Sequence, residues 1–90
     1  SLDEQQRYTE AIESYDKALD ISPHDIKALN NKAVIFNKLK RHNEAIECYD
    51  KTISIYSNDI TAYFNKGLSL YELKRYNEAI ECYNKVISID

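Results

Sequence analysis

An almost identical segment occurs three times in this chain, at Arg7–Lys17, Arg41–Lys51 and Arg75–Lys85, so the repeat distance is 34 residues each time. A period of about 20 to 50 residues is typical of solenoids, in which each unit buries its apolar face only against its neighbours. The spacing therefore predicts a stack of similar units. It favours an interaction scaffold over a protein built around one chemical centre.

Within each unit, apolar residues recur at the spacing of an α-helix. In Ile26–Leu39 and Ile60–Leu73 they follow at steps of one, four, three and three, which places them on one helix face. The segments Asn43–Ile55 and Asn77–Ile89 have a pattern of the same kind. Short links between helices force antiparallel neighbours, so we expect an all-α chain of helix pairs. The first two stripes consist of Ala28, Leu29, Ala33, Phe36 and Leu39, and of Ala62, Tyr63, Gly67, Leu70 and Leu73.

Polar residues mark where the helices are expected to begin. Asp25 and Asp59 precede the first helix of each pair, where a carboxylate can accept hydrogen bonds from free backbone N–H groups. The second helices are expected to be capped by Thr9, Asn43 and Asn77, to within a residue or two.

Unit length and residue sizes together resemble the tetratricopeptide repeat family, which consists of 34-residue helix-turn-helix units. On the first helix of each unit, a bulky residue is followed by a small one and then by another bulky one. On the second helix, the order is a small residue, an aromatic residue and a small residue. Small residues let crossing helices approach while the aromatic side chain fills the adjacent groove. The matching positions are Leu29, Ala33 and Phe36, then Tyr63, Gly67 and Leu70, and on the second helices Ala11, Tyr15 and Ala18, Ala45, Tyr49 and Thr52, and Ala79, Tyr83 and Val86.

This resemblance implies a right-handed α-solenoid of antiparallel helix-turn-helix repeats, in a single domain over residues 1–90. Residues 26–59 would form the second repeat and residues 60–90 the third, which lacks its final residues. Residues 1–25 would form a partial first repeat, because Ser1–Glu4 aligns with Ser69–Glu72 and corresponds to the end of a first helix.

The resemblance also implies a noncatalytic protein-binding scaffold, whose first helices line a concave groove for an extended peptide or a partner's helix. Asn31 and Asn65 share one groove position, and an amide can both donate to and accept from a peptide main chain. The same amides could instead serve neighbouring backbone groups or water. The expected groove residues are Lys27, Asn30, Asn31, Val34, Asn37 and Lys38 in the second repeat, and Thr61, Phe64, Asn65, Leu68, Tyr71 and Glu72 in the third.

Other residue types are expected to be structural. His24 and His42 are predicted to be solvated turn residues, and Cys48 and Cys82 to be small packing residues, because equivalent positions of stacked helices are too far apart for a disulfide. Repeated acidic pairs, such as Glu44 with Glu47, are assigned to a solvated outer face. The tyrosines of the second helices are assigned to packing; these are Tyr8, Tyr15, Tyr49, Tyr76 and Tyr83.

Several functional classes are disfavoured. A single glycine excludes a glycine-rich phosphate loop, and no nucleophile–base pair or metal-ligand cluster stands out, so we expect no catalytic residue, metal or cofactor. The net charge of -3 argues against nucleic acid, and no apolar run is long enough to cross a membrane. The expected compartment is the cytoplasm, although a fragment would have lost any targeting segment.

Two alternatives to peptide binding stay open. The face around Ile80, Tyr83, Ile87 and Ile89 has no covering helix in this sequence, which is compatible with self-association or end-to-end stacking of repeats. The chain could equally be a fragment of a longer array. A protein or peptide partner is expected in the leading interpretation.

Overall fold

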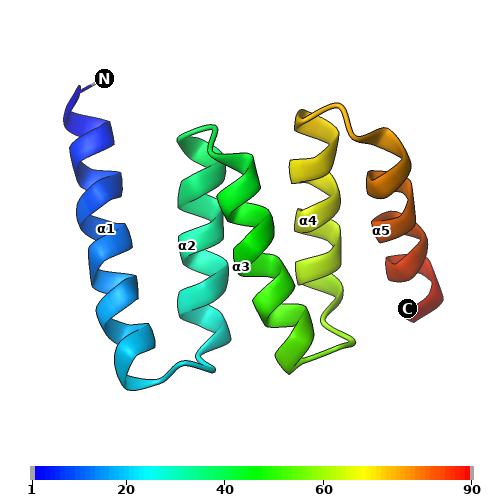
Figure 1. The fold of residues 1–90 in the computed structure, drawn as a ribbon, viewed down its shortest axis with the longest axis horizontal. Helices are drawn as coiled ribbons and strands as arrows, with labels where there is room; N and C mark the ends of the chain where they lie inside the picture. The colour runs from blue at the N-terminus through cyan, green and yellow to red at the C-terminus, as the bar shows by residue number, and fades with distance from the viewer. Residues whose placement is uncertain (1, 90) are drawn as a thin grey trace.

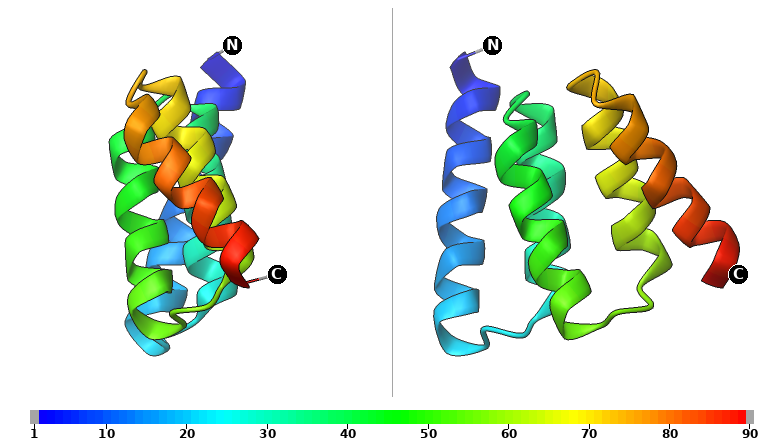
Figure 2. Two further views of the ribbon diagram at one scale, coloured as in Figure 1. Left: turned by 90° about the vertical axis from the view of Figure 1, so that its right-hand side faces the viewer. Right: turned by 45° about the vertical axis from the view of Figure 1, so that its right-hand side comes forward.

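The computed structural model describes residues 2–89, apart from the side chain of Leu2, and consists of five helices in a row (Figure 1). The main contacts join consecutive helices, which run antiparallel, and α5 is tilted relative to α1 (Figure 2). The predicted all-α architecture of antiparallel helix pairs is confirmed. The helices are α1 (Leu2–Ile21), α2 (Ile26–Lys38), α3 (His42–Ile55), α4 (Ile60–Glu72) and α5 (Tyr76–Ile89).

Aspartates cap α2 and α4, as the sequence predicts. The Asp25 carboxylate accepts hydrogen bonds from the backbone N–H groups of Lys27 at 3.0 Å and Ala28 at 3.3 Å. The Asp59 carboxylate accepts one from the N–H group of Ala62 at 3.1 Å. These carboxylates satisfy N–H groups that have no partner inside the helix, and they face the positive end of the helix dipole.

Replacing Asp59 by alanine is expected to lower the free energy of unfolding by about 1 kcal/mol, because the first turn of α4 loses its acceptor. Urea denaturation followed by circular dichroism measures the change. The matched control is Asp20→Ala in the exposed last turn of α1, where a carboxylate is unfavourably placed next to the helix dipole. Equal losses in the two variants would contradict the capping role of Asp59.

The second helices begin at His42 and Tyr76, within the predicted margin of one or two residues, so Asn43 and Asn77 lie inside the helices and are not caps themselves. Lys40 and Lys74 adopt left-handed conformations, with φ of 61° and 63°, and redirect the chain before α3 and α5 begin. Arg41 then precedes α3 and makes no side-chain cap hydrogen bond. Its guanidinium instead donates to the Glu44 carboxylate, with Nε–Oε1 at 2.6 Å, and this carboxylate lies in the positively polarised first turn.

The same arrangement recurs one unit later. The guanidinium of Arg75 donates to the Glu78 carboxylate from Nε at 2.9 Å and from Nη2 at 2.6 Å. Each arginine holds the pKa of its glutamate below the usual value, because it hydrogen-bonds to the charged form. Glu44 and Glu78 therefore anchor the starts of α3 and α5, whereas Glu10 of the first acidic pair lies inside α1.

The beginning of the chain also differs from the prediction. Residues 2–4 do not form the end of a separate helix, because α1 is continuous from Leu2 to Ile21. Thr9 lies inside α1, where its hydroxyl donates to the backbone carbonyl of Gln5 at 2.9 Å, so it is not a cap. Ser1 lies outside the described residues.

Small residues allow the helices of the core to pack closely. Ala33, Ala45 and Ala62 are fully buried around Phe36 and Tyr49. At the crossing of α4 and α5, a Cβ atom added to Gly67 would lie 2.6 Å from Cε1 of Tyr83, which is closer than atoms can pack. Cys48 and Cys82 are buried and free, and burial raises the pKa of each thiol, so the prediction that they are packing residues is confirmed.

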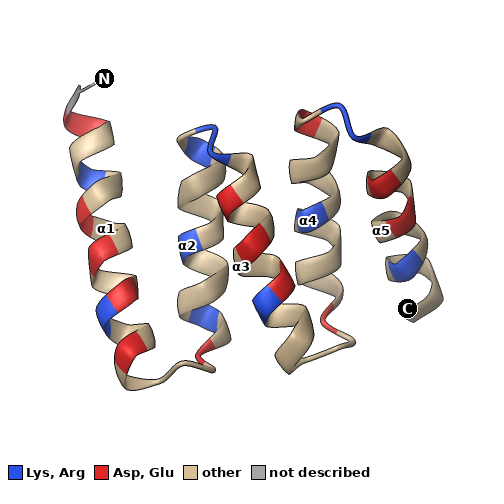
Figure 3. Cartoon of the chain, viewed as in Figure 1, with Lys and Arg blue, Asp and Glu red and all other residues tan. Residues whose placement is uncertain are grey.

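Equivalent salt bridges join α1 to α2 and α3 to α4. The Lys32 ammonium of α2 lies 2.5 Å from the Asp16 carboxylate of α1, and the Lys66 ammonium of α4 lies 2.6 Å from Asp50 of α3. The lysine side chains are 19% and 25% exposed, so each ammonium is largely shielded where it meets its carboxylate. Charged residues are spread over the whole row of helices (Figure 3). The two pairs make the junctions α1/α2 and α3/α4 chemically equivalent.

Candidate functional site

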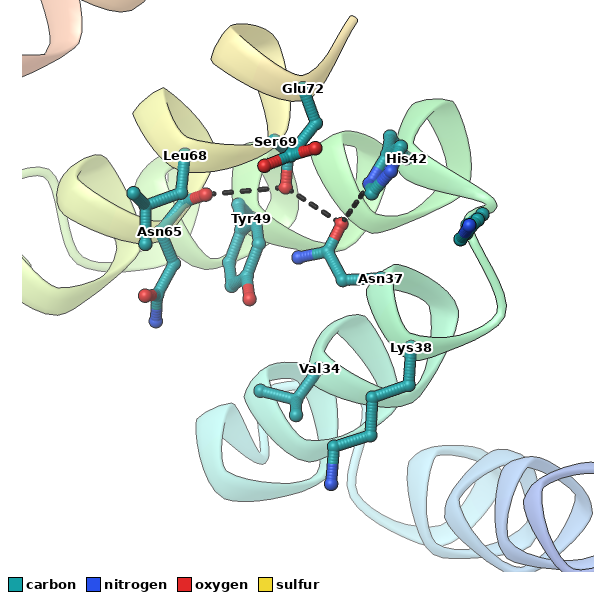
Figure 4. A pocket seen from close by; sticks show the side chains of 10 residues that line it. Val34, Asn37, Lys38, His42, Tyr49, Asn65, Leu68, Ser69 and Glu72 are labelled. Atoms are coloured by element: carbon teal, nitrogen blue, oxygen red, sulfur yellow. Dashed lines mark hydrogen bonds between the residues drawn. The ribbon is translucent and has the colours of Figure 1, made fainter. Parts of the chain in front are cut away.

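A hollow of about 710 Å³ lies where α2, the start of α3 and α4 meet (Figure 4). First helices of successive pairs, α2 and α4, supply most of its walls, as the sequence predicts for a groove. Its lining combines amides, ammonium groups, a carboxylate and aliphatic side chains. The lining residues are Val34, Asn37, Lys38, Lys40, His42, Tyr49, Asn65, Leu68, Ser69 and Glu72.

A hydrogen-bonded cluster fixes one wall of the hollow. Oδ1 of Asn37 accepts a hydrogen bond from the Ser69 hydroxyl at 2.9 Å and lies 2.8 Å from Nδ1 of His42 (Figure 4). The Ser69 hydroxyl is also 3.2 Å from the carbonyl oxygen of Asn65. Asn37 therefore joins α2 to both α3 and α4.

His42 is consequently not the solvated turn residue that was predicted. It is the first residue of α3, is partly buried and contacts Asn37 across the turn from α2. The reason is the early start of α3, which places the ring above the last turn of α2 instead of in open solvent. His24, by contrast, is exposed in the turn between α1 and α2, as predicted.

Tyr49 forms the floor of the hollow and is only 1% exposed. Burial raises the pKa of its phenol to about 12, because the phenolate would be poorly solvated there, while a hydrogen bond with Asn37 acts in the opposite direction. The hydroxyl therefore remains a neutral polar group at physiological pH. The packing role predicted for Tyr49 is confirmed, whereas Tyr76 is 48% exposed and lies outside the core, where its ring packs against that of Tyr71.

Opposite charges and exposed aliphatic groups occupy the rim. Lys38 and Lys40 bring positive charge to one side, and Glu72 brings negative charge from α4. The Lys38 ammonium also lies 5.9 Å from the centre of the Tyr8 ring, within the range of a cation–π contact with α1. Val34 and Leu68 are 39% and 43% exposed, so they offer apolar contact area without closing the hollow.

Half of the predicted groove residues line this hollow, namely Val34, Asn37, Lys38, Asn65, Leu68 and Glu72. The other half do not line it, namely Lys27, Asn30, Asn31, Thr61, Phe64 and Tyr71. Several of these have partners inside the fold: Oδ1 of Asn30 accepts a hydrogen bond from the Thr52 hydroxyl at 3.3 Å. The Phe64 ring centre lies 6.0 Å from that of Tyr83, and the Tyr71 ring meets Tyr76 edge-on at 5.3 Å.

Sequence reasoning missed four lining residues: Lys40, His42, Tyr49 and Ser69. Ser69 carried a sequence signal, because it is a hydroxyl residue directly before Leu70 of the apolar stripe; in the structure it is 1% exposed. Lys40 and His42 carried no sequence signal for lining the hollow, because their positions depend on the left-handed turn between α2 and α3.

An open row of antiparallel helix pairs that repeat every 34 residues defines a helical-repeat protein. The sequence profile of the tetratricopeptide repeat family matches residues 2–58 and, in a second register, residues 24–90. The chain belongs to the tetratricopeptide repeat family, whose repeats form noncatalytic protein-binding modules.

Solved structures agree with this assignment. The crystal structure of MamA superposes with a TM-score of 0.88 at 26% identity and covers 92% of this chain and 48% of MamA, so the chain spans about half of that protein. The first tetratricopeptide domain of Spaghetti (RPAP3), solved with the HSP90 peptide SRMEEVD, superposes with a TM-score of 0.87 at 26% identity, covering 96% of this chain and 68% of that one. No curated protein sequence matches significantly.

Neither a membrane-spanning helix nor a metal-binding cluster occurs among residues 2–89. None of the described helices is both long and apolar enough to span a bilayer. Within the same residues, no group of three or more histidine, cysteine, aspartate or glutamate side chains is placed to hold a metal ion.

Proposed function

We propose that this chain binds an extended peptide, or a helix of a partner protein, in the groove between α2 and α4. The observation that carries the proposal is the hollow itself, in which an accessible amide, cationic groups and aliphatic side chains converge from two successive first helices. The peptide bound to the first domain of Spaghetti supports the same use of a similar fold.

The lining suggests how a peptide would be held. Asn65 offers a donor and an acceptor to the peptide main chain, while Val34 and Leu68 offer contact to apolar side chains. Lys38 and Lys40 would favour acidic residues at one end of the peptide. Because Thr61 and Asn65 occupy positions where some family members place basic residues that bind a terminal carboxylate, we expect recognition along the main chain rather than of the peptide terminus.

Selection from a displayed library of random peptides, followed by fluorescence anisotropy with the tightest binder, tests this function. Asn65→Ala is expected to bind that peptide about two- to tenfold more weakly, because the lost hydrogen bond contributes about 0.5 to 1.5 kcal/mol. The double variant Asn31→Ala/Asn65→Ala tests whether the groove extends beyond the hollow, which Asn31 does not line. Asn43→Ala is the matched control, since this amide is exposed on α3 and outside the hollow. Amidation of the peptide's C-terminus should leave the affinity unchanged.

Two results would contradict the proposal. One is a library that yields no binder; the other is a binder whose affinity falls with Asn43→Ala but not with the double variant. Loss in Asn65→Ala alone, with no further loss from Asn31→Ala, would restrict the site to the hollow and remove Asn31 from it.

A further inference from the structure

One position on the first helices reverses its charge from one repeat to the next. Lys38 is the last residue of α2, and Glu72, which lies 34 positions later, is the last residue of α4. Both side chains line the hollow between these helices, and Lys40 adds a second positive charge next to Lys38. Figure 4 shows Lys38 and Glu72 on opposite sides of the hollow, with Asn37 between them. The hollow therefore has a positive side on α2 and a negative side on α4.

The charges of the hollow are not neutralised within the fold. The ion pairs described above, such as Lys32 with Asp16, join residues that do not line the hollow. Among residues 2–89, neither Lys38, Lys40 nor Glu72 forms an ion pair, and all three are exposed. The contact of Lys38 with a tyrosine ring leaves its charge uncompensated. These charges are therefore available to a molecule that enters the hollow.

The two charged sides decide which peptides are complementary to the hollow. Between them lie amide and hydroxyl groups, including Asn37 and Ser69, which are hydrogen-bonded to each other at 2.9 Å. A uniformly acidic peptide would bring like charge to Glu72, and a uniformly basic one would bring it to Lys38 and Lys40; both contacts oppose binding. A peptide that carries both signs, separated along its length, matches the hollow in one of its two directions.

We infer that the groove selects peptides of mixed charge and fixes the direction in which they bind. An acidic side chain of the peptide lies at Lys38 and Lys40, and a basic side chain farther along the same peptide lies at Glu72. The main chain between them passes Asn65. This inference rests on the proposed function, because the charges have nothing to select unless a peptide binds in the groove. It narrows the class of partner from peptides with acidic residues to peptides that carry separated opposite charges.

Exchange of charges within the peptide provides the first test. The probe is the tightest binder from the displayed library, compared with a synthetic copy in which its acidic and basic residues exchange places. Composition and net charge are then identical. Fluorescence anisotropy at low salt should show that the wild type binds the exchanged copy about tenfold more weakly, because two attractive pairs become repulsive. High salt should reduce the difference. Measurement at about pH 8 minimises the contribution of histidine charge.

Exchange of charges within the protein provides the second test. Lys38→Glu/Glu72→Lys reverses both sides of the hollow at constant net charge, and it should bind the exchanged copy more tightly than the original peptide. The new carboxylate at the end of α2 is unfavourable for the helix dipole, but the new ammonium at the end of α4 is favourable, so the variant should fold. Circular dichroism checks this. The matched control, Glu47→Lys/Lys51→Glu, exchanges two exposed charges of α3 outside the hollow and should keep the wild-type preference.

The outcomes separate this inference from the proposed function. A peptide that Asn65→Ala weakens, but that binds the wild type equally well after its charges are exchanged, would overturn the inference and leave the proposed function intact. A tightest binder without both an acidic and a basic residue would have the same meaning. So would a folded Lys38→Glu/Glu72→Lys variant that keeps the wild-type preference, or a control that reverses it. A library that yields no binder would contradict both.

Discussion

Replacing Tyr49 by alanine is expected to lower the free energy of unfolding by about 3 to 5 kcal/mol, the usual cost of removing a fully buried aromatic side chain. The ring packs among Ala33, Ala45 and Ala62, small residues whose packing cannot fill the space it would leave. A small domain has about 5 to 13 kcal/mol of stability in total, so this variant should be only marginally folded. Urea or thermal denaturation followed by circular dichroism measures the loss.

Tyr15→Ala is the matched control, because Tyr15 occupies the same repeat position in α1 but is only partly buried. Its loss should be less than half that of Tyr49→Ala. Similar losses in both variants would mean that repeat position, rather than burial against neighbours on two sides, determines what this tyrosine contributes.

Alkaline pH is expected to destabilise the fold through the same residue. An unfolded tyrosine ionises near pH 10, whereas burial raises the pKa of Tyr49 to about 12 in the folded protein. The folded state therefore binds more protons than the unfolded state between these values, and stability falls as the pH rises through them. The stabilisation is fully present well below pH 10 and is lost as the pH rises through 12, a total of about 2 to 3 kcal/mol at 1.36 kcal/mol for each pH unit.

Tyr49→Phe isolates this contribution, because lysines, cysteines and other tyrosines also titrate in this range. Urea denaturation of both proteins at pH 9, 11 and 12 gives the comparison. The difference in stability between wild type and variant should shift by about 2 to 3 kcal/mol in favour of Tyr49→Phe from pH 9 to pH 12. Parallel curves for the two proteins would show that the Tyr49 phenol ionises as easily in the folded state as in the unfolded one.

Sequence periodicity predicted the helices well, because an apolar stripe repeated at intervals of 34 residues leaves few other ways to bury the same side chains. The aspartate caps were also predictable, since the carboxylate acts on N–H groups two or three residues away. The starts of α3 and α5 were not, because they depend on left-handed Lys40 and Lys74. No local signal distinguishes a lysine that adopts this conformation from one that continues a helix.

The groove was predictable in part for a similar reason. Family position identified side chains such as Asn65 and Leu68, which point from a first helix into the hollow. It did not identify which amides are already satisfied within the fold. Asn30 accepts from Thr52, and Asn37 from Ser69, across distances of 22 and 32 residues along the chain. Contacts of this length depend on how helices are placed in space, so neither composition nor period reveals them.

The order of helix contacts has a mechanical consequence. Each helix contacts mainly the helices before and after it in the chain, and among residues 2–89 no substantial contact joins the two ends of the row. Loss of the terminal helix would thus leave the packing of α1 on α2 largely undisturbed, and flexing can occur at every joint. A ligand bound between α2 and α4 would restrict motion at two helix contacts at once, α2 with α3 and α3 with α4. Binding is therefore expected to reduce the flexibility of the row of helices.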